Sequence, residues 1–234
     1  MTRTRIAVLA SGGGTNLQAI LEYLEQLGER RSGDVVVVAS DRADAGALTR
    51  AASRGIETAI LATPRRPEGA ALGALLDRHR VEIVALAGYL RRVPDDVVRR
   101  YAGRMLNVHP ALLPGFGGAG MYGARVHEAV LAAGVTVTGV TVHFVNEEYD
   151  RGPIVAQWPV PVLTGDDRHT LAERVLHVEH LLYPRVLNAV ASGRLTLASC
   201  ADGRRVAGSL DSEFIMLSRK EKCLAEAIDR ALDC

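Results

Sequence analysis

The sequence predicts an α/β protein with a Rossmann-like, three-layer architecture, in which a mostly parallel central sheet carries helices on both faces. Short apolar runs of strand length alternate with segments of helical periodicity, which is typical of βαβ units. The composition agrees, because 48% of the 234 residues are hydrophobic but only 4% are aromatic, as in buried sheets of small aliphatic residues. In such sheets, ligands bind at the carboxyl ends of the strands.

The first half of the chain contains five predicted strands and four predicted helices. The strands are the apolar runs at residues 5–11, 34–41, 56–61, 82–89 and 104–109. The helices are expected at 15–27, 43–54, 67–80 and 94–101, each after a helix-start signal such as glycines, Asp41 or a proline in the first turn.

The second half predicts a less regular end of the sheet. Residues 135–145 alternate between apolar and small or polar side chains, which indicates a strand with two different faces. Residues 152–162 form a further strand whose prolines suit a sheet edge or a strand end. A long helix is expected at 167–192. We expect one domain over 1–194, with halves at about 1–103 and 104–194.

Residues 195–234 are expected to form a C-terminal extension. A turn is predicted at Asp202-Gly203, followed by an amphipathic helix. Its apolar side chains lie largely along one side of that helix. We expect this side to cover part of the core, and a dimer contact is the alternative. The residues of this side are Leu217, Leu224, Ile228 and Leu232.

Charge and cysteine usage exclude several function classes. The formal net charge is only +1, whereas a general nucleic-acid-binding protein needs a basic excess on one face. The cysteines at 200, 223 and 234 have no metal-ligand spacing, and an odd count suits a reducing compartment. The apolar run at the N-terminus is too short to span a membrane and lacks a signal-peptide cleavage pattern. A cytoplasmic location is therefore predicted.

A glycine-rich turn, "SGGGTN" at 11–16, follows the first strand and opens the first helix. Amides at a helix N-terminus bind anions, and Thr15 and Asn16 can add side-chain donors. The dinucleotide fingerprint is not met because Leu17 stands where it needs a glycine. Asp41 could be the ribose-binding acid of a nicotinamide enzyme, but a helix cap is the favoured interpretation. The turn suits a phosphate monoester better than a dinucleotide.

The stretch "LNVHPALLP" at 106–114 places polar side chains at a strand end. Residues two apart on a strand face the same way, so Asn107 and His109 should point out of the sheet together. Pro110 restricts His109 to an extended conformation and stops the sheet ladder. We therefore expect an amide and an imidazole side by side at the carboxyl edge of the sheet.

Asp150 is the expected third member of this site. It follows a strand and precedes Arg151-Gly152-Pro153, a turn that would hold it in place. A carboxylate near His109 would raise the pKa of the imidazole and keep it cationic, giving an oxyanion hole made of side chains. The position of Asp150 also fits an ordinary turn aspartate. On spacing alone, that is the better interpretation.

Other polar residues are expected to have supporting or structural roles. Thr141 and His143 share the polar face of their strand and should form internal hydrogen bonds. His177 and His180 have metal-compatible spacing, but no pattern supplies a third ligand, so no metal is expected. No Ser or Cys occupies a nucleophile-elbow motif.

Taken together, these motifs resemble the phosphoribosylglycinamide formyltransferase family of folate-dependent enzymes. The resemblance extends from about residue 5 to about residue 193. It is carried by "SGGGTNLQAI", "SDRADAGAL", "VALAGYLRRV", "GRMLNVHPALLP", "GVTVHFVNEEYDRGPIVAQ" and "VEHLLYP". It implies formyl transfer from 10-formyltetrahydrofolate to the amine of glycinamide ribonucleotide, a step of de novo purine biosynthesis, with no nucleic acid, membrane or metal involved and with the chain as a monomer or homodimer.

The resemblance also implies residue roles. The 1–103 half would bind phosphate, and the 104–194 half would hold the catalytic and folate residues. His109, held cationic by Asp150, and Asn107 would stabilise the oxyanion, while Asp150 helps to move the proton through water. The implied catalytic residues are Asn107, His109 and Asp150; the ribonucleotide contacts are Gly14, Thr15, Asn16 and Glu179; the folate contacts are Arg65, Leu90, Arg91, Arg92, Val93 and Asn107.

Two positions depart from the family pattern. The loop at 115–126 is longer than in many members, and Leu176 replaces a polar residue that often contacts the phosphate. Two other functions remain as alternatives. One is hydrolysis of 10-formyltetrahydrofolate by the same three residues, and the other is a non-catalytic module that binds sugar phosphates.

Overall fold

The structure is a computed structural model that describes residues 2–61, 68–198, 206–207 and 221–233. Its centre is a sheet of eight strands in the order β3-β2-β1-β4-β5-β6-β7-β8. Every neighbouring pair is parallel except the two that β6 makes with β5 and β7. The strands are β1 (Thr4–Leu9), β2 (Gly33–Ser40), β3 (Glu57–Ile60), β4 (Ile83–Leu86), β5 (Met105–His109), β6 (Val137–Phe144), β7 (Ile154–Pro161) and β8 (Val206–Ala207).

The helices confirm the predicted alternation along the chain. They are α1 (Thr15–Leu27), α2 (Gly46–Ala52), α3 (Glu68–Arg78), α4 (Asp95–Arg100), α5 (Ala124–Ala132), α6 (Arg168–Ala191) and α9 (Glu221–Asp233), with a short 3-10 turn, η1 (Gly28–Arg30). The sequence patterns did not predict η1 or α5, whereas β8 lies in an extended piece expected after the turn at Asp202-Gly203. In α5 the buried His127 shares the inward face with Val126 and Val130 and weakens its apolar period.

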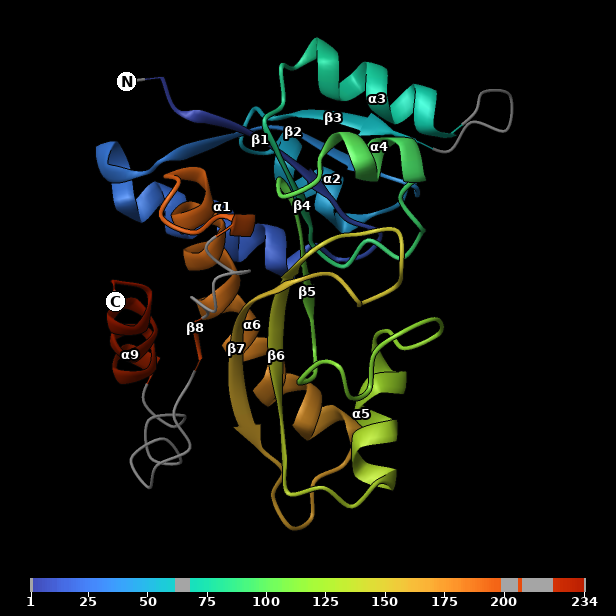
Figure 1. Ribbon diagram of the computed structural model, residues 1–234, viewed down its shortest axis with the longest axis vertical. Helices are drawn as coiled ribbons and strands as arrows, with labels where there is room; N and C mark the ends of the chain where they lie inside the picture. The colour runs from blue at the N-terminus through green and yellow to red at the C-terminus, as the bar shows by residue number, and fades with distance from the viewer. Residues whose placement is uncertain (1, 62–67, 199–205, 208–220, 234) are drawn as a thin grey trace.

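Two apolar clusters lie on opposite faces of the sheet. Along β1, Ile6 and Val8 face one cluster and Ala7 and Leu9 face the other, as the two-residue period of a strand requires. The larger cluster is covered by α1, α2, α5 and α6, and the smaller one by α3 and α4. The three-layer α/β prediction is confirmed (Figure 1).

The polar side chains of β5 lie on the face that α3 and α4 cover only in part. Leu106 and Val108 belong to the larger cluster, so Asn107 and His109 project from the opposite face, on the same side as Met105. Helices α3 and α4 pack over the β1–β4 side of the sheet (Figure 1). Beyond them this face is available for a site.

The C-terminal helix packs against the body of the protein. Leu224, Ile228 and Leu232 of α9 are buried in the larger cluster (α9 lies beside α6 in Figure 1). Arg185 of α6 donates from Nε to Asp229 Oδ1 at 2.8 Å. The expected covering role of this apolar side is confirmed for these three residues. Leu217 and the turn at Asp202-Gly203 lie outside the described residues.

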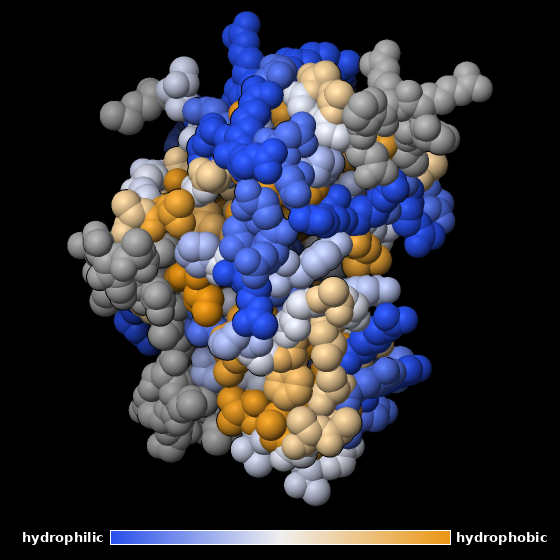
Figure 2. Space-filling view, turned by 45° about the vertical axis from the view of Figure 1, so that its right-hand side comes forward, coloured by the Kyte–Doolittle hydropathy of each residue, from blue (hydrophilic) through white to orange (hydrophobic). Residues whose placement is uncertain are grey.

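The surface is mixed in character. On the face shown in Figure 2, hydrophilic side chains occupy most of the upper part, and the largest continuous hydrophobic area lies near the lower end. Within the part of the chain that the structure describes, no helix is both long enough and apolar enough to cross a membrane.

Candidate active site

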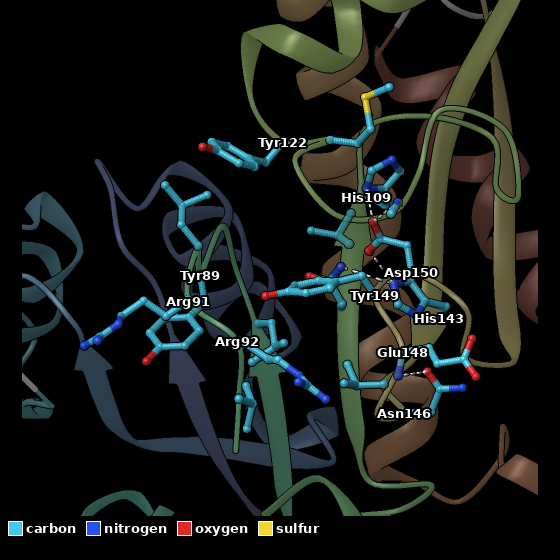
Figure 3. A pocket seen from close by; sticks show the side chains of 18 of the residues that line it. Tyr89, Arg91, Arg92, His109, Tyr122, His143, Asn146, Glu148, Tyr149 and Asp150 are labelled. Carbon is cyan, nitrogen blue, oxygen red and sulfur yellow. Dashed lines mark hydrogen bonds and ion pairs between the residues drawn. The ribbon is translucent and has the colours of Figure 1, made fainter. Parts of the chain in front are cut away.

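A cavity of about 180 Å³ opens where β4 and β5 end. Asn107 and His109 of β5 and His143 of β6 line it, together with residues 88–93 and the loop 145–150. This confirms that Asn107 and His109 share one face at the carboxyl edge of the sheet. Figure 3 shows Asp150 between His109 and His143. The three predicted catalytic side chains therefore meet in one cavity.

Both ring nitrogens of His109 face oxygen acceptors. Nε2 lies 2.8 Å from the carbonyl oxygen of Phe116, and Nδ1 lies 3.6 Å from Asp150 Oδ2. Phe116 and Asp150 both have positive φ angles, of 53° and 54°. Side chains other than glycine seldom adopt this conformation, which costs free energy and concentrates at functional sites. The backbone is strained at both groups that flank this imidazole.

The carboxylate of Asp150 is held from several directions. Its Oδ2 accepts a 2.9 Å hydrogen bond from the Gly118 amide, and its Oδ1 lies 3.6 Å from His143 Nε2. The following turn depends on Gly152, because a Cβ there would lie 1.7 Å from the carbonyl oxygen of Phe144. The chain directly after Asp150 thus packs closely against the end of β6.

The pKa values of this pair correct one expectation. Burial lowers the pKa of His109, and this outweighs the opposing effects of Asp150 and the Phe116 carbonyl. The prediction that Asp150 holds His109 cationic is therefore wrong for the ligand-free protein. Burial alone would raise the pKa of Asp150, but His143, the Gly118 amide and His109 together hold it below its usual range. At neutral pH the pair is a carboxylate beside a neutral imidazole.

His143 is a member of this cluster that the sequence indicated only as a supporting residue. It lies directly opposite Asn107 in the antiparallel β5–β6 pair. Its Nδ1 donates to the carbonyl oxygen of Phe144 at 2.9 Å, and in that tautomer Nε2 accepts from Asn107 Nδ2 at 3.1 Å. Thr141 donates to the Ala111 carbonyl, which confirms the predicted internal bonding of this polar face. His143 thereby orients the amide of Asn107.

The segment 90–93 forms the wall of the cavity across from Asp150. All four predicted folate contacts within it line the cavity, as Asn107 does, whereas Arg65 lies outside the described residues. Arg92 donates from Nη2 to Asp95 Oδ1 at 2.7 Å and to the carbonyl oxygen of Glu147 at 3.0 Å. Exposed apolar side chains ring the opening: Leu90, Tyr122 and Tyr149.

The glycine turn borders a different space. Gly14 has a φ of 76°, and a Cβ there would lie 2.6 Å from Ala47 Cα, so only glycine fits. Thr15 lines a second cavity, of about 700 Å³, between α1 and α6. The carbonyl oxygen of Gly13 accepts a 2.8 Å hydrogen bond from Arg50 Nε. Neither Gly14 nor Thr15 lines the cavity that contains His109.

Asn16 and Glu179 form a buried pair. Asn16 Nδ2 donates to Glu179 Oε2 at 2.6 Å, which joins the start of α1 to α6. Burial raises the pKa of Glu179 to about 7, and the hydrogen bond from Asn16 offsets only part of that effect. Asn16 Oδ1 has no hydrogen-bond partner among the described residues. The predicted ribonucleotide contacts are adjacent to each other but do not line the first cavity.

Asp41 does not cap a helix. The N-cap of α2 is Ala45, which has no side-chain cap hydrogen bond. Asp41 Oδ1 instead accepts a 2.5 Å hydrogen bond from the buried hydroxyl of Ser11. The cap interpretation was wrong because Asp41 lies too far before the helix. Ser11 was absent from the predicted set, since one serine at a strand end gives no distinctive signal.

This fold and this cluster define a class of enzyme. A sequence model of the family described as formyl transferase matches residues 4–187. The chain therefore belongs to the formyl transferase family.

Individual relatives show which kind of formyl transferase this chain is similar to. The chloroplastic phosphoribosylglycinamide formyltransferase of Arabidopsis thaliana is 42% identical over 198 residues, which cover 82% of this chain and 67% of the relative. The trifunctional purine biosynthetic protein adenosine-3 of Bos taurus is 42% identical over 83% of this chain. A solved phosphoribosylglycinamide formyltransferase from Coxiella burnetii has a TM-score of 0.76 and 38% identity, covering 83% of this chain and 90% of that one.

The lengths of these relatives differ. The chain spans about two thirds of the plant relative and 19% of the bovine one. The match therefore covers only part of each of these two relatives.

Proposed function

We propose that this enzyme transfers the formyl group of 10-formyltetrahydrofolate to the amine of glycinamide ribonucleotide. The products are formylglycinamide ribonucleotide and tetrahydrofolate. The observation that carries the proposal is the meeting of Asn107, His109 and Asp150 in one cavity of a formyl transferase chain. The names of the relatives, which specify this substrate, support the same reaction.

The cavity suits direct attack of the amine on the formyl carbon. A carbon–nitrogen bond to the ribonucleotide forms and the bond to the donor nitrogen breaks, while negative charge develops on the formyl oxygen. Asn107 Nδ2 carries two hydrogens, and only one is directed to His143. The second can stabilise the developing oxyanion. Removing such a donor typically costs about a hundredfold or more in rate.

His109 is placed to move the proton. Its Nε2–H donates to the Phe116 carbonyl, so Nδ1 is the nitrogen that can accept the proton lost by the attacking amine. The imidazolium that forms then faces the carboxylate of Asp150, 3.6 Å away. The imidazolium then gives this proton to the leaving donor nitrogen, so that His109 returns to its neutral form and the exchange balances. Asp150 thus stabilises the charged imidazole during the reaction, although it does not keep His109 charged beforehand.

The two substrates approach from different elements. We place the folate in the cavity against residues 90–93, and the phosphate of the ribonucleotide at the glycine turn. Glu179 would then contact the ribose beside Asn16. A metal-free reaction, a cytoplasmic location and a monomeric or homodimeric state complete the proposal. They rest on the sequence patterns alone.

A single assay tests the reaction. The protein is incubated with 10-formyltetrahydrofolate, with and without glycinamide ribonucleotide, and the release of tetrahydrofolate is followed. We expect release only when the ribonucleotide is present. Release without the ribonucleotide would identify a hydrolase. No release under either condition would favour a non-catalytic module that binds sugar phosphates.

A further inference from the structure

Ser11 joins three strand ends at the centre of the sheet. Its side chain is buried at the end of β1, with the residue 1% exposed. Its amide donates to the carbonyl oxygen of Gly88 at 3.0 Å, and its Oγ accepts from the amide of Leu90 at 2.8 Å. The same hydroxyl donates to Asp41 Oδ1, which follows β2, at 2.5 Å. One side chain therefore connects the segments that follow β1, β2 and β4.

The direction of these hydrogen bonds gives Asp41 a specific effect. A serine hydroxyl has one hydrogen and two lone pairs. The carboxylate of Asp41 takes the hydrogen, which leaves a lone pair directed at the Leu90 amide. Without Asp41 the hydroxyl could rotate to other acceptors. Asp41 thus acts on Leu90 through Ser11, without contacting Leu90 itself in any hydrogen bond of the described residues.

The residues that Ser11 holds belong to the wall of the active-site cavity. Gly88, Tyr89 and Leu90 line that cavity, and Gly88 has a φ of 73°, so the chain turns sharply there. The strand order runs outward in both directions from β1 and β4. Open α/β sheets bind ligands in the crevice at such a reversal. Ser11 therefore bridges the crevice at the point where a ligand is expected.

We propose that Ser11 and Asp41 are positioning residues for the formyl-donor side of the site. They hold the turn at 88–90 in the shape that receives the folate-type co-substrate. The identity of this ligand rests on the proposed function. The pair acts as one unit, because the hydrogen bonds of the described residues connect Asp41 to this wall only through the hydroxyl of Ser11.

The test uses Ser11→Ala, Asp41→Ala, Asp41→Asn and the double variant Ser11→Ala/Asp41→Ala. Ser40→Ala is the matched control, since Ser40 is also a buried serine at a strand end, where its Oγ accepts only the local Arg42 amide among the hydrogen bonds described. KM for 10-formyltetrahydrofolate and for glycinamide ribonucleotide are measured separately. Calorimetry gives Kd for tetrahydrofolate, which requires no turnover.

We expect Ser11→Ala and Asp41→Ala to raise the donor KM and the tetrahydrofolate Kd roughly tenfold, as for loss of a charge-assisted hydrogen bond. The ribonucleotide KM should rise less than the donor KM, because the Ser11 hydroxyl is directed at Asp41 and the Leu90 amide and not into the glycine turn. The double variant should match the single variants because the two residues act in series. Asp41→Asn keeps an acceptor at this position and should therefore retain most of the affinity for tetrahydrofolate.

Two results would overturn the positioning role. One is an equal rise in both KM values with a melting temperature lowered beyond that of Ser40→Ala, which indicates a general structural defect. The other is unchanged binding of tetrahydrofolate in both single variants. If the parent protein binds tetrahydrofolate but transfers no formyl group, the proposed function fails while the binding measurements still decide this inference.

Discussion

Asp150 and Glu179 are both withdrawn from solvent, yet their surroundings move their pKa values in opposite directions. The pKa of Asp150 lies below its usual range, and that of Glu179 is raised to about 7. The side chain of Asp150 is 13% exposed, and Glu179 is 7% exposed as a residue. Burial opposes the charged form in both cases. The difference lies in the number and kind of the partners.

The carboxylate of Asp150 has three polar neighbours. The Gly118 amide donates to Oδ2, and two histidines stand 3.6 Å away, one beside each oxygen. Glu179 has a single described hydrogen bond, from Asn16. A buried carboxylate stays charged where its neighbours favour the ion and gains a proton where they do not. The first region therefore keeps its charge at neutral pH, whereas the second is sensitive to pH near neutrality.

The largest expected effect is on the Asp150 side of this comparison. Asp150→Asn removes the charge that stabilises a protonated His109, so we expect kcat to fall on the order of a hundredfold or more. Calorimetric binding of tetrahydrofolate should persist within a fewfold, because the cavity keeps its shape. Asp44→Asn is the control, since Asp44 pairs with Arg42 on the exposed surface. Retention of full activity by Asp150→Asn would contradict the assigned role.

The next effect concerns the stability of the Glu179 region. Raising the pKa of Glu179 from its ordinary value of 4.5 to about 7 means that the folded protein binds this proton more tightly than the unfolded chain does. The free energy of unfolding should therefore fall by on the order of 3 kcal/mol as pH rises from 4.5 to 7, and stay level above 7.

Glu179→Gln removes this titration. The free energies of unfolding of the parent protein and the variant are measured in urea from pH 5 to 8. The stability of the parent protein relative to the variant should fall as pH rises. The matched control is Glu25→Gln, which makes the same substitution at an exposed position of α1, the helix that carries Asn16. A pH-independent difference for Glu179→Gln would mean that the carboxyl is charged throughout this range.

Substitution of His143, which lies beside Asp150, should have a smaller effect on the rate. His143→Gln should lower kcat about tenfold, because Asn107 loses the partner that orients its amide while the principal proton-transfer groups remain. The donor KM should change little. The control is His79→Gln, which alters a similarly buried histidine near β3 that pairs with Glu57. Equal losses in the two variants would indicate that the effect comes from packing alone.

The sequence predicted the fold and the side-by-side placement of Asn107 and His109 from short-range patterns, whereas Asp150 was selected only through the family resemblance. The strand and helix runs alternate, and the two-residue period of β5 places Asn107 and His109 on one face. The contribution of His143 depends on its cross-strand register with Asn107, which no local pattern gives. The charge state of His109 depends on how deeply three separate segments bury it, so spacing alone predicted the wrong direction. Ser11 likewise acquires its partners only when β1, β2 and β4 align.

The smallest expected effect lies at the edge of the Asp150 loop. Arg92 ties Asp95, at the start of α4, to the carbonyl oxygen of Glu147 across the cavity. Its side chain is 52% exposed, and surface interactions of this kind contribute about 1 kcal/mol or less. Arg92→Met should therefore raise the donor KM only about threefold, and raising the salt concentration should reproduce part of this change in the parent protein. An effect as large as that of Asp150→Asn would show that direct contact of Arg92 with the folate, and not its hydrogen bonds to Asp95 and Glu147, accounts for most of its contribution.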